Sequence, residues 1–285
     1  MTTTTPAAPR ALDGIRLGFS GLVRSEWIKL RSVRSTMWCY GLIILLTIGF
    51  GLLYSATVSE SSDISVETQN SLAVQGMTLS VNFTQLIAAV LGVLVISGEY
   101  GTGMIRSTFT AAPGRLSAYF AKALVLAVTT FVVSVVSIAV TALVTAPILS
   151  GKGIDAQLGE SSVLLPLLGG AVYLTLIAVL AFTFGAIVRN SAGGIASVLG
   201  LVLVVPVVLQ IFGALTRADW ITNLAAFTPS NAGGKIFAYV PDAAQQAQPP
   251  AGIVSLNATE GLLVLIAWVV VFGIVGALLT KRRDV

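Results

Sequence analysis

Residues that could carry out chemistry are few in this sequence, and they are not distributed as an enzyme would need them. The chain contains no histidine and one cysteine, Cys39, which lies in an apolar run. This excludes His and Cys metal clusters, thiol–histidine nucleophiles and internal disulfides. The long apolar runs contain no Asp, Glu, Lys or Arg, which disfavours acid–base catalysis inside a bilayer, as in an intramembrane protease or lipid hydrolase. We therefore expect no catalytic residue, no metal site and no cofactor in this chain.

The charged side chains gather instead in two basic stretches, and the first runs from Gly98 to Lys122. It interrupts two long apolar runs and sets Arg106, Arg115 and Lys122 against a single acid, Glu99. Its pattern predicts a short helix with a capping threonine, an apolar side and a Pro-Gly pair that ends it. The residues in these roles are Thr102, then Met104, Ile105, Thr108 and Phe109, then Pro113 and Gly114. The chemistry that this stretch favours is docking of a soluble partner.

The second basic stretch, residues 19–35, has the pattern of an amphipathic helix. Trp27 and the neighbouring basic residues are typical of a helix that lies in the headgroup layer of a membrane. Glu26 is the exception, because it projects into the middle of the apolar face, where an unpaired carboxylate is costly. We expect Glu26 to pair with a basic residue from another segment or another subunit, and snorkelling to the headgroups is the alternative.

The elements that must position these stretches are six long apolar runs. The chain has 285 residues, of which 55% are hydrophobic and 10% charged, and its mean hydropathy is +0.93. So few charges could not cover so much apolar surface in a soluble domain, and the composition predicts an all-α polytopic membrane protein. The predicted spans are residues 37–56, 79–96, 123–147, 163–188, 194–215 and 262–280.

The distribution of charge predicts the orientation of these spans. With six spans both termini share one side, and all but three of the Lys and Arg residues then fall on that side. The exceptions are Lys152, Arg217 and Lys235. By the positive-inside rule both termini are cytoplasmic. The net charge of +4 is therefore explained by topology and anionic membrane lipids, and nucleic acid is not expected as a partner.

Neutral polar residues give the best candidates for a transport pathway inside the spans. They are Asn82 and Gln85 on one face of the second span and Gln210 in the fifth, and hydrogen bonds between helices would explain them equally well. Pro206 should kink the fifth span and leave a carbonyl group for a neighbouring helix or a cavity to satisfy. Beyond this span, residues 220–227 and 230–239 predict two short helices separated by Pro229.

Three segments together resemble the permease subunits of ABC-2-type transporters, especially those of actinobacteria. They are RSEWIKLRSVRSTMW at residues 24–38, GEYGTGMIRSTFTAAPGR at residues 98–115 and TPSNAGG at residues 228–234. The resemblance extends over nearly the whole chain. It implies one ABC-2 transmembrane domain of the type V exporter kind over residues 19–280, between a disordered cytoplasmic tail, residues 1–18, and a basic cytoplasmic tail, residues 281–285.

The resemblance also implies roles for individual residues. Residues 19–35 would form the elbow helix, with Arg24, Glu26, Trp27 and Lys29 as its functional side chains. Residues 98–118 would form the loop that couples the spans to an ATP-binding subunit. Its candidate coupling residues are Glu99, Tyr100, Gly101, Thr102, Arg106 and Arg115. The outer helices, residues 219–240, would be re-entrant and close the outer end of the pathway.

The resemblance implies a transporter whose motor is a separate chain. No phosphate-binding P-loop occurs here, because Gly233-Gly234-Lys235 is followed by Ile236 and lacks the first glycine. ATP and magnesium would bind a partner ATPase, and a second permease chain, identical or related, would complete the complex. We expect export of a hydrophobic or amphipathic compound across the bacterial plasma membrane. The alternatives are an immunity or sensing protein of the same fold and a secondary transporter, although the lack of ionisable residues in the spans argues against proton coupling.

Overall fold

The chain folds into a bundle of long helices, and its computed structural model describes residues 18–60, 64–111, 114–241 and 252–282. No β-strand occurs among these residues. The expected tail of residues 1–18 and the end of the basic tail thus lie almost wholly outside the described residues. The helices are α1 Phe19–Ser32, α2 Arg34–Thr57, α3 Val66–Thr78, α4 Val81–Thr102, α5 Met104–Ala111, α6 Arg115–Ser150, α7 Ser161–Val188, α8 Ser191–Leu199, η1 Gly200–Val204, α9 Val205–Thr216, α10 Asp219–Ala226, α11 Pro229–Gly234 and α13 Ala258–Arg282.

Six of the described helical stretches are long and apolar enough to cross a membrane, as predicted. They are Arg34–Thr57, Val66–Thr102, Arg115–Ser150, Ser161–Val188, Ser191–Thr216 and Ala258–Arg282. The second is 37 residues long because α3 leads directly into α4. Helix α3 was not predicted. It is partly polar, and Asn70 and Gln69 accept hydrogen bonds from the backbone N–H groups of Gln157 and Asp155 in the distant α6–α7 connection.

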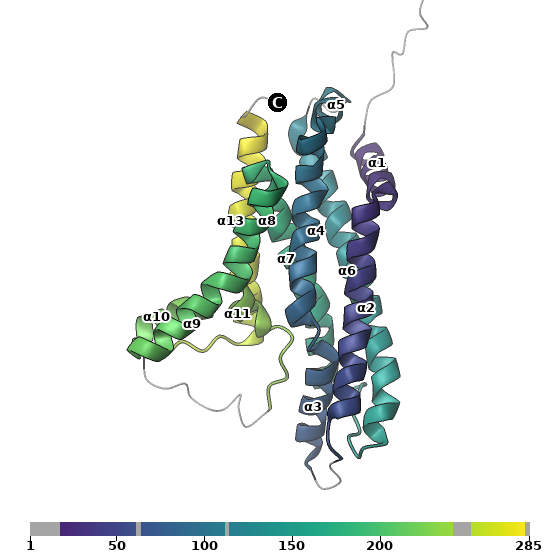
Figure 1. The fold of residues 1–285 in the computed structure, drawn as a ribbon, viewed down its shortest axis with the longest axis vertical. Coiled ribbons are helices and arrows are strands. Elements are labelled where there is room, and N and C mark those ends of the chain that lie inside the picture. Colours follow the sequence, from purple (N-terminus) through teal and green to yellow (C-terminus); the bar gives the residue numbers. More distant parts are fainter. Residues whose placement is uncertain (1–17, 61–63, 112–113, 242–251, 283–285) are drawn as a thin grey trace, which may run out of the picture.

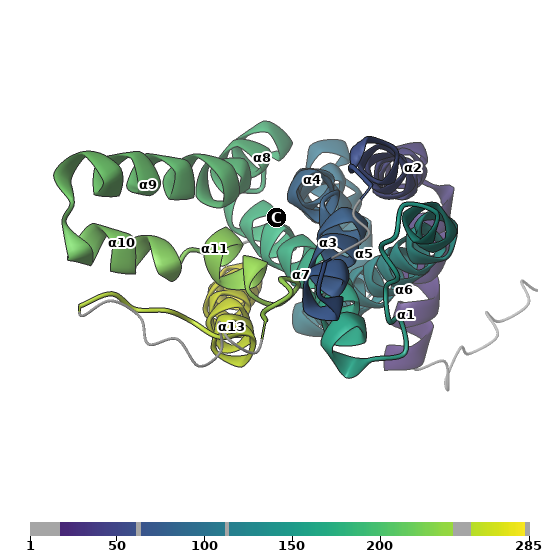
Figure 2. The same cartoon turned by 90° about the horizontal axis from the view of Figure 1, so that it is seen from below.

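Helix α7 is the centre of the bundle. In its most apolar window 61% of the residues are buried, against 17% in Ser191–Thr216 and in α13. Helices α4, α6 and α13 pack around it (Figures 1 and 2). Helices α4 and α7 cross so closely that a Cβ at Gly92 would overlap the carbonyl oxygen of Ala178. Only glycine therefore fits at this crossing. The first described helix and the end of α13 lie at the same end of the bundle, together with α5 (Figure 1).

The fifth span is bent away from the bundle, and its α9 half forms an arm with α10 (Figures 1 and 2). The bend contains the π-helical turn η1 and Pro206. In an α-helix the carbonyl of Val202 would accept a hydrogen bond from residue 206, but proline has no N–H to donate. The hydroxyl of Ser230 in α11 donates to this carbonyl instead, at 2.7 Å. A neighbouring helix therefore satisfies the group, as the sequence predicted.

The two short helices between the fifth and sixth spans are present, but the second is shorter than predicted. Helix α11 begins at Pro229 and ends at Gly234, whereas the sequence indicated a helix to residue 239. Consecutive glycines, Gly233 and Gly234, end it because glycine loses more backbone entropy in a helix than any other residue. A Cβ at Gly233 would overlap the ring of Tyr173, so α11 lies directly against α7. Whether these helices are re-entrant in a membrane stays a prediction.

Candidate functional site

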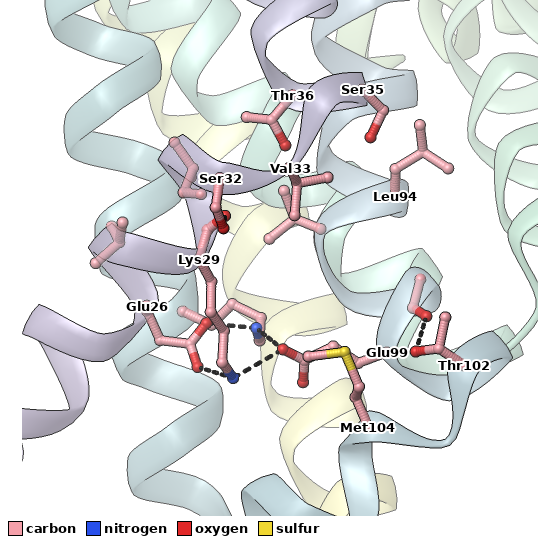
Figure 3. Close-up of a pocket in the computed structure, with 15 residues that line it drawn as sticks. Glu26, Lys29, Ser32, Val33, Ser35, Thr36, Leu94, Glu99, Thr102 and Met104 are labelled. Carbon is pink, nitrogen blue, oxygen red and sulfur yellow. Dashed lines mark hydrogen bonds and ion pairs between the residues drawn. The ribbon is translucent and has the colours of Figure 1, made fainter.

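Four charged side chains from three helices form one cluster at the end of the bundle where α1 and α5 lie. We call Glu26, Lys29, Glu99 and Lys122 the charge cluster. The Nζ atom of Lys122 donates to Glu26 Oε2 at 2.5 Å and to Glu99 Oε1 at 2.7 Å. The Nζ atom of Lys29 donates to Glu26 Oε1 at 2.9 Å and to Glu99 Oε1 at 3.0 Å (Figure 3). Each carboxylate therefore contacts both ammonium groups.

Local sequence explains how each helix brings its charges to this point. Glu26 and Lys29 are three residues apart, which places them on the same face of α1. Glu99 lies in the last turn of α4, just before Gly103 ends the helix in the left-handed conformation, at φ 74°. Lys122 lies two turns into α6. The cluster thus joins the first helix to the ends of the second and third spans.

Burial makes this pairing energetically important. Glu26, Glu99 and Lys122 are 4%, 7% and 5% exposed. Ions so far from water are stable only when they are paired and hydrogen-bonded, and removing one partner of a buried pair typically costs about 3–5 kcal/mol. The basic partner expected for Glu26 is therefore present, and it comes from another segment, α6. The sequence had marked Lys122 as part of a basic loop without indicating this contact.

Lys29 is the most exposed member of the cluster, and it remains charged under ordinary conditions. Burial alone would lower its pKa, but the hydrogen bonds from Lys29 to Glu26 and Glu99 outweigh burial and raise the pKa above 10.5. A raised folded-state pKa means that this ion pair stabilises the fold below the unfolded-state pKa and is lost only as the pH rises through the folded value. The cluster should therefore not respond to pH changes around neutrality through Lys29.

The short helix α5 is attached to the charge cluster through Thr108. The Thr108 hydroxyl accepts a hydrogen bond from Lys29 Nζ at 3.3 Å. The same hydroxyl donates a long, weak hydrogen bond to Glu99 Oε2 at 3.4 Å. Ile105 is 3% exposed and fixes the apolar side of α5, while Arg106 is exposed. Helix α5 therefore presents one exposed basic residue, Arg106, and is connected on its inner side to α1 and α4. The Pro-Gly pair was predicted to end this helix. Gly114 is described and directly precedes α6, but Pro113 lies outside the described residues.

The predicted capping role of Thr102 is wrong. Thr102 is the last residue of α4, and its hydroxyl donates to the carbonyl of Gly98 in the same helix at 2.9 Å. Helix α4 ends one residue later, at Gly103, because only glycine readily takes the left-handed conformation found there. Thr102 and Gly101 nevertheless remain exposed at the end of the bundle beside α5.

Tyr100 has a contact that the sequence did not reveal. The guanidinium carbon of Arg189, at the end of α7, lies 5.0 Å from the centre of the Tyr100 ring. Arg189 Nη2 also donates to the carbonyl of Leu279 in α13 at 3.3 Å. Tyr100 therefore helps to join α4, α7 and α13, which is a packing role in this chain. A single Arg after a long apolar run is the sequence feature that could have drawn attention to this place.

The three pathway candidates do not converge on one site. The hydroxyl of Tyr173 in α7 donates to Gln85 Oε1, and Gln85 is 8% exposed. Asn82 is exposed and donates to the carbonyl of Leu79 in its own turn. Gln210 donates to Asn231 of α11 at 3.3 Å. Hydrogen bonding between helices thus accounts for Gln85 and Gln210, and their part in a pathway stays a prediction.

The remaining predicted site residues lie on the surface around the charge cluster. Arg24 is exposed on α1, Trp27 is 41% exposed, and Arg31 lies over the Trp27 ring at 5.8 Å. Arg115 is half-buried at the start of α6. Within the part of the chain that the structure describes, no group of three or more His, Cys, Asp or Glu side chains could hold a metal ion. The arrangement joins α1, α4, α5 and α6 at one end of the bundle through charged and polar side chains.

Comparison with known protein families gives a match. The family model described as "ABC-2 family transporter protein" matches residues 22–207. The matched region contains all four members of the charge cluster, the whole of α5 and the bend of the fifth span. A search of curated proteins finds no match.

Proposed function

Since the chain belongs to the ABC-2 family of transporter proteins, we propose that it is the permease subunit through which a separate ATP-binding subunit drives export. The observation that carries this proposal is the connection between α5 and the charge cluster. A short, exposed, basic helix at one end of the bundle is joined to α1 and α4 through Thr108, and the cluster extends this connection to α6. A partner that binds α5 could therefore move three helices together.

The proposed mechanism is alternating access. ATP binding closes the motor subunits, α5 moves with the motor surface, and the charge cluster transmits this movement to α1, α4 and α6. Net transport requires that the substrate binds the inward-facing and outward-facing states with different affinities. Within this mechanism the end of the bundle that carries α5 faces the cytoplasm, and so do both termini.

The proposed assembly contains two permease chains and two ATPase subunits, which bind the ATP and magnesium. The fifth and sixth spans are the least buried, with 17% of their most apolar windows buried, and either lipid or a second permease chain can cover their apolar surface. The polar groups within the spans are amides and hydroxyls, which suit a hydrophobic or amphipathic substrate. A secondary transporter would lack such a coupled motor. An immunity or sensing protein of this fold could keep an ATPase partner and would differ by having no transported cargo.

The first test is affinity purification of the tagged protein from its native membrane in mild detergent, followed by mass spectrometry. Recovery of an ABC ATPase in equal amount is the expected result. Replacing Arg106 with Glu should then reduce ATPase recovery about tenfold, because a reversed charge opposes an acidic partner surface. Arg282→Glu is the matched control, since it reverses an exposed charge at the same end of the bundle but away from α5. Equal ATPase recovery with both variants would contradict docking at α5.

A further inference from the structure

A cavity of about 290 Å³ lies beside the charge cluster, between the α1–α2 junction and the end of α4. Ligand sites in proteins have volumes of about 300–1,000 Å³, so this cavity suits a small group or one part of a larger molecule. Its walls are apolar and its two ends are polar. The apolar wall residues are Leu30, Val33, Leu94, Val95 and Val125. The charge cluster forms one end, and Ser35 and Thr36 lie at the opposite end (Figure 3).

Hydrogen-bonding capacity remains at two groups of the charged end, Glu99 and Lys122. An ammonium group has three protons, and those of Lys29 are taken by Glu26, Glu99 and Thr108. In contrast, among the described residues Glu99 Oε2 is approached by the Thr108 hydroxyl alone, at 3.4 Å, beyond the ordinary length of an O–H···O bond, about 2.5–3.0 Å. Each carboxylate oxygen can accept about two hydrogen bonds. Lys122, which also lines the cavity, donates to Glu26 and Glu99 and has one further proton. A ligand at this end can therefore donate to Glu99 Oε2 and accept from Lys122.

Charge balance restricts the ligand further. The cluster holds two carboxylates and two ammonium groups, so its formal charge is zero. A ligand with a net charge would leave an uncompensated ion in a partly buried site, which is unfavourable. A zwitterion avoids this cost: its ammonium can donate to Glu99 Oε2, and its anionic group can lie near Lys29, whose side chain is 31% exposed.

The depth of the cavity indicates where such a zwitterion comes from. The first span begins at Arg34, directly after the cavity wall formed by α1, and Glu99 lies three residues before the second span ends. The cavity is thus at the boundary of the apolar helices, at the level of the headgroups. Trp27 with Arg31 on the exposed side of α1 is typical of a helix at that level.

From this geometry we propose that the cavity binds a phospholipid whose headgroup is phosphoethanolamine. The primary ammonium donates to Glu99 Oε2, the phosphate faces Lys29, and the start of the lipid's apolar part lies against Leu30 and Val33. The bound lipid forms part of the contact between α1 and α4. This site does not depend on the proposed motor, because every group in it belongs to the permease chain.

The test compares two lipids that differ only at nitrogen. Purified full-length protein is mixed with equal amounts of phosphatidylethanolamine and phosphatidylcholine with the same acyl chains, and bound lipids are counted by native mass spectrometry. Phosphatidylcholine has no N–H to donate, so we expect about tenfold more bound phosphatidylethanolamine, the effect of one charge-assisted hydrogen bond. Equal binding of the two lipids would overturn the proposal, whether or not an ATPase couples to this chain.

A pair of variants locates the site. Val33 lines the cavity and is 46% exposed, so Val33→Phe should fill the opening without altering the charge cluster, and the preference should disappear. Met37→Phe is the control, because Met37 is equally accessible one turn further along but lies outside the cavity lining. Val33→Phe that kept the full preference would show that the lipid binds elsewhere, and so would Met37→Phe that lost it.

A third arm separates a lipid from a free headgroup. Soluble glycerophosphoethanolamine is added as a competitor against bound phosphatidylethanolamine. We expect no displacement at equal concentration, since the soluble compound lacks the apolar part that contacts Leu30 and Val33. Displacement at equal concentration would mean that the acyl chains contribute nothing, and the assignment to a lipid would be wrong.

Discussion

The two ends of the helix bundle are held together by different chemistry. At the end with α1 and α5, long charged side chains join three helices, and the backbones need not touch. Toward the other end, α11 lies directly against α7 and α13, because glycine lets backbones approach. A Cβ at Gly233 of α11 would overlap the Tyr173 ring of α7, and one at Gly261 of α13 would overlap the carbonyl oxygen of Ala232 in α11. The hydrogen bonds there, from Ser230 and Asn231, are neutral.

This difference shows how the distances between helices can be fixed at one end of the bundle while the helices tilt relative to one another at the other end. A glycine contact fixes the distance between two backbones, because any separation loses van der Waals contact at once. Ion pairs between long side chains can be kept while helices tilt, since several rotatable bonds adjust. We therefore expect relative movement of α1, α4 and α6 at the charged end, and little movement of α11 against α7 and α13.

The largest expected effect is at the charged end. Lys122→Met would leave Glu26 and Glu99 with Lys29 as their remaining partner in the cluster, and the free energy of unfolding should fall by about 3–5 kcal/mol. The thermal unfolding midpoint in detergent measures this. Adding Glu99→Gln to Lys122→Met restores the charge balance, so the double variant should regain much of the loss. A double variant less stable than the single one would show that charge balance does not hold this end together.

The next largest effect tests the glycine contact between α11 and α13. Gly261→Val places a branched side chain against the Ala232 carbonyl, and overpacking of this kind costs about 1–3 kcal/mol. Gly273→Val is a matched control on the same helix, because a Cβ at Gly273 meets no atom within 4 Å. We expect a lower unfolding midpoint for Gly261→Val than for Gly273→Val. Equal midpoints would mean that α11 is not fixed by this contact.

The smallest effect concerns the hydrogen bond at the bend of the fifth span. Ser230→Ala removes the donor to the Val202 carbonyl and should cost about 1 kcal/mol. In a Pro206→Ala background the new N–H can satisfy that carbonyl, so the same serine substitution should cost less. A double-mutant cycle based on unfolding midpoints measures the difference. Additive effects would show that Ser230 does not compensate for the proline.

The sequence predicted the spans well because each is a long apolar run, a property that needs no tertiary information. It also identified Glu26 as a residue in need of a partner. It could not identify Lys122 as that partner, since the contact depends on how three helices cross. Helix α3 was missed for a similar reason: Asn70 in α3 is 4% exposed and is satisfied by a backbone group from the α6–α7 connection. Thr102 was wrongly predicted to cap the short helix, because α4 continues through Thr102 and ends at Gly103.

The π-helical turn in the fifth span changes how positions along that span should be counted. A π-helix bonds residue i to i+5, so η1 contains more residues per turn than the α-helices on either side. Each residue of an α-helix advances the side chain by about 100°, and the extra residue therefore rotates α9 relative to α8. A single helical wheel drawn through residues 191–216 misplaces every side chain beyond Val204. Removing one residue from η1 would turn Gln210 away from Asn231, so the length of this turn sets which face of α9 meets α11.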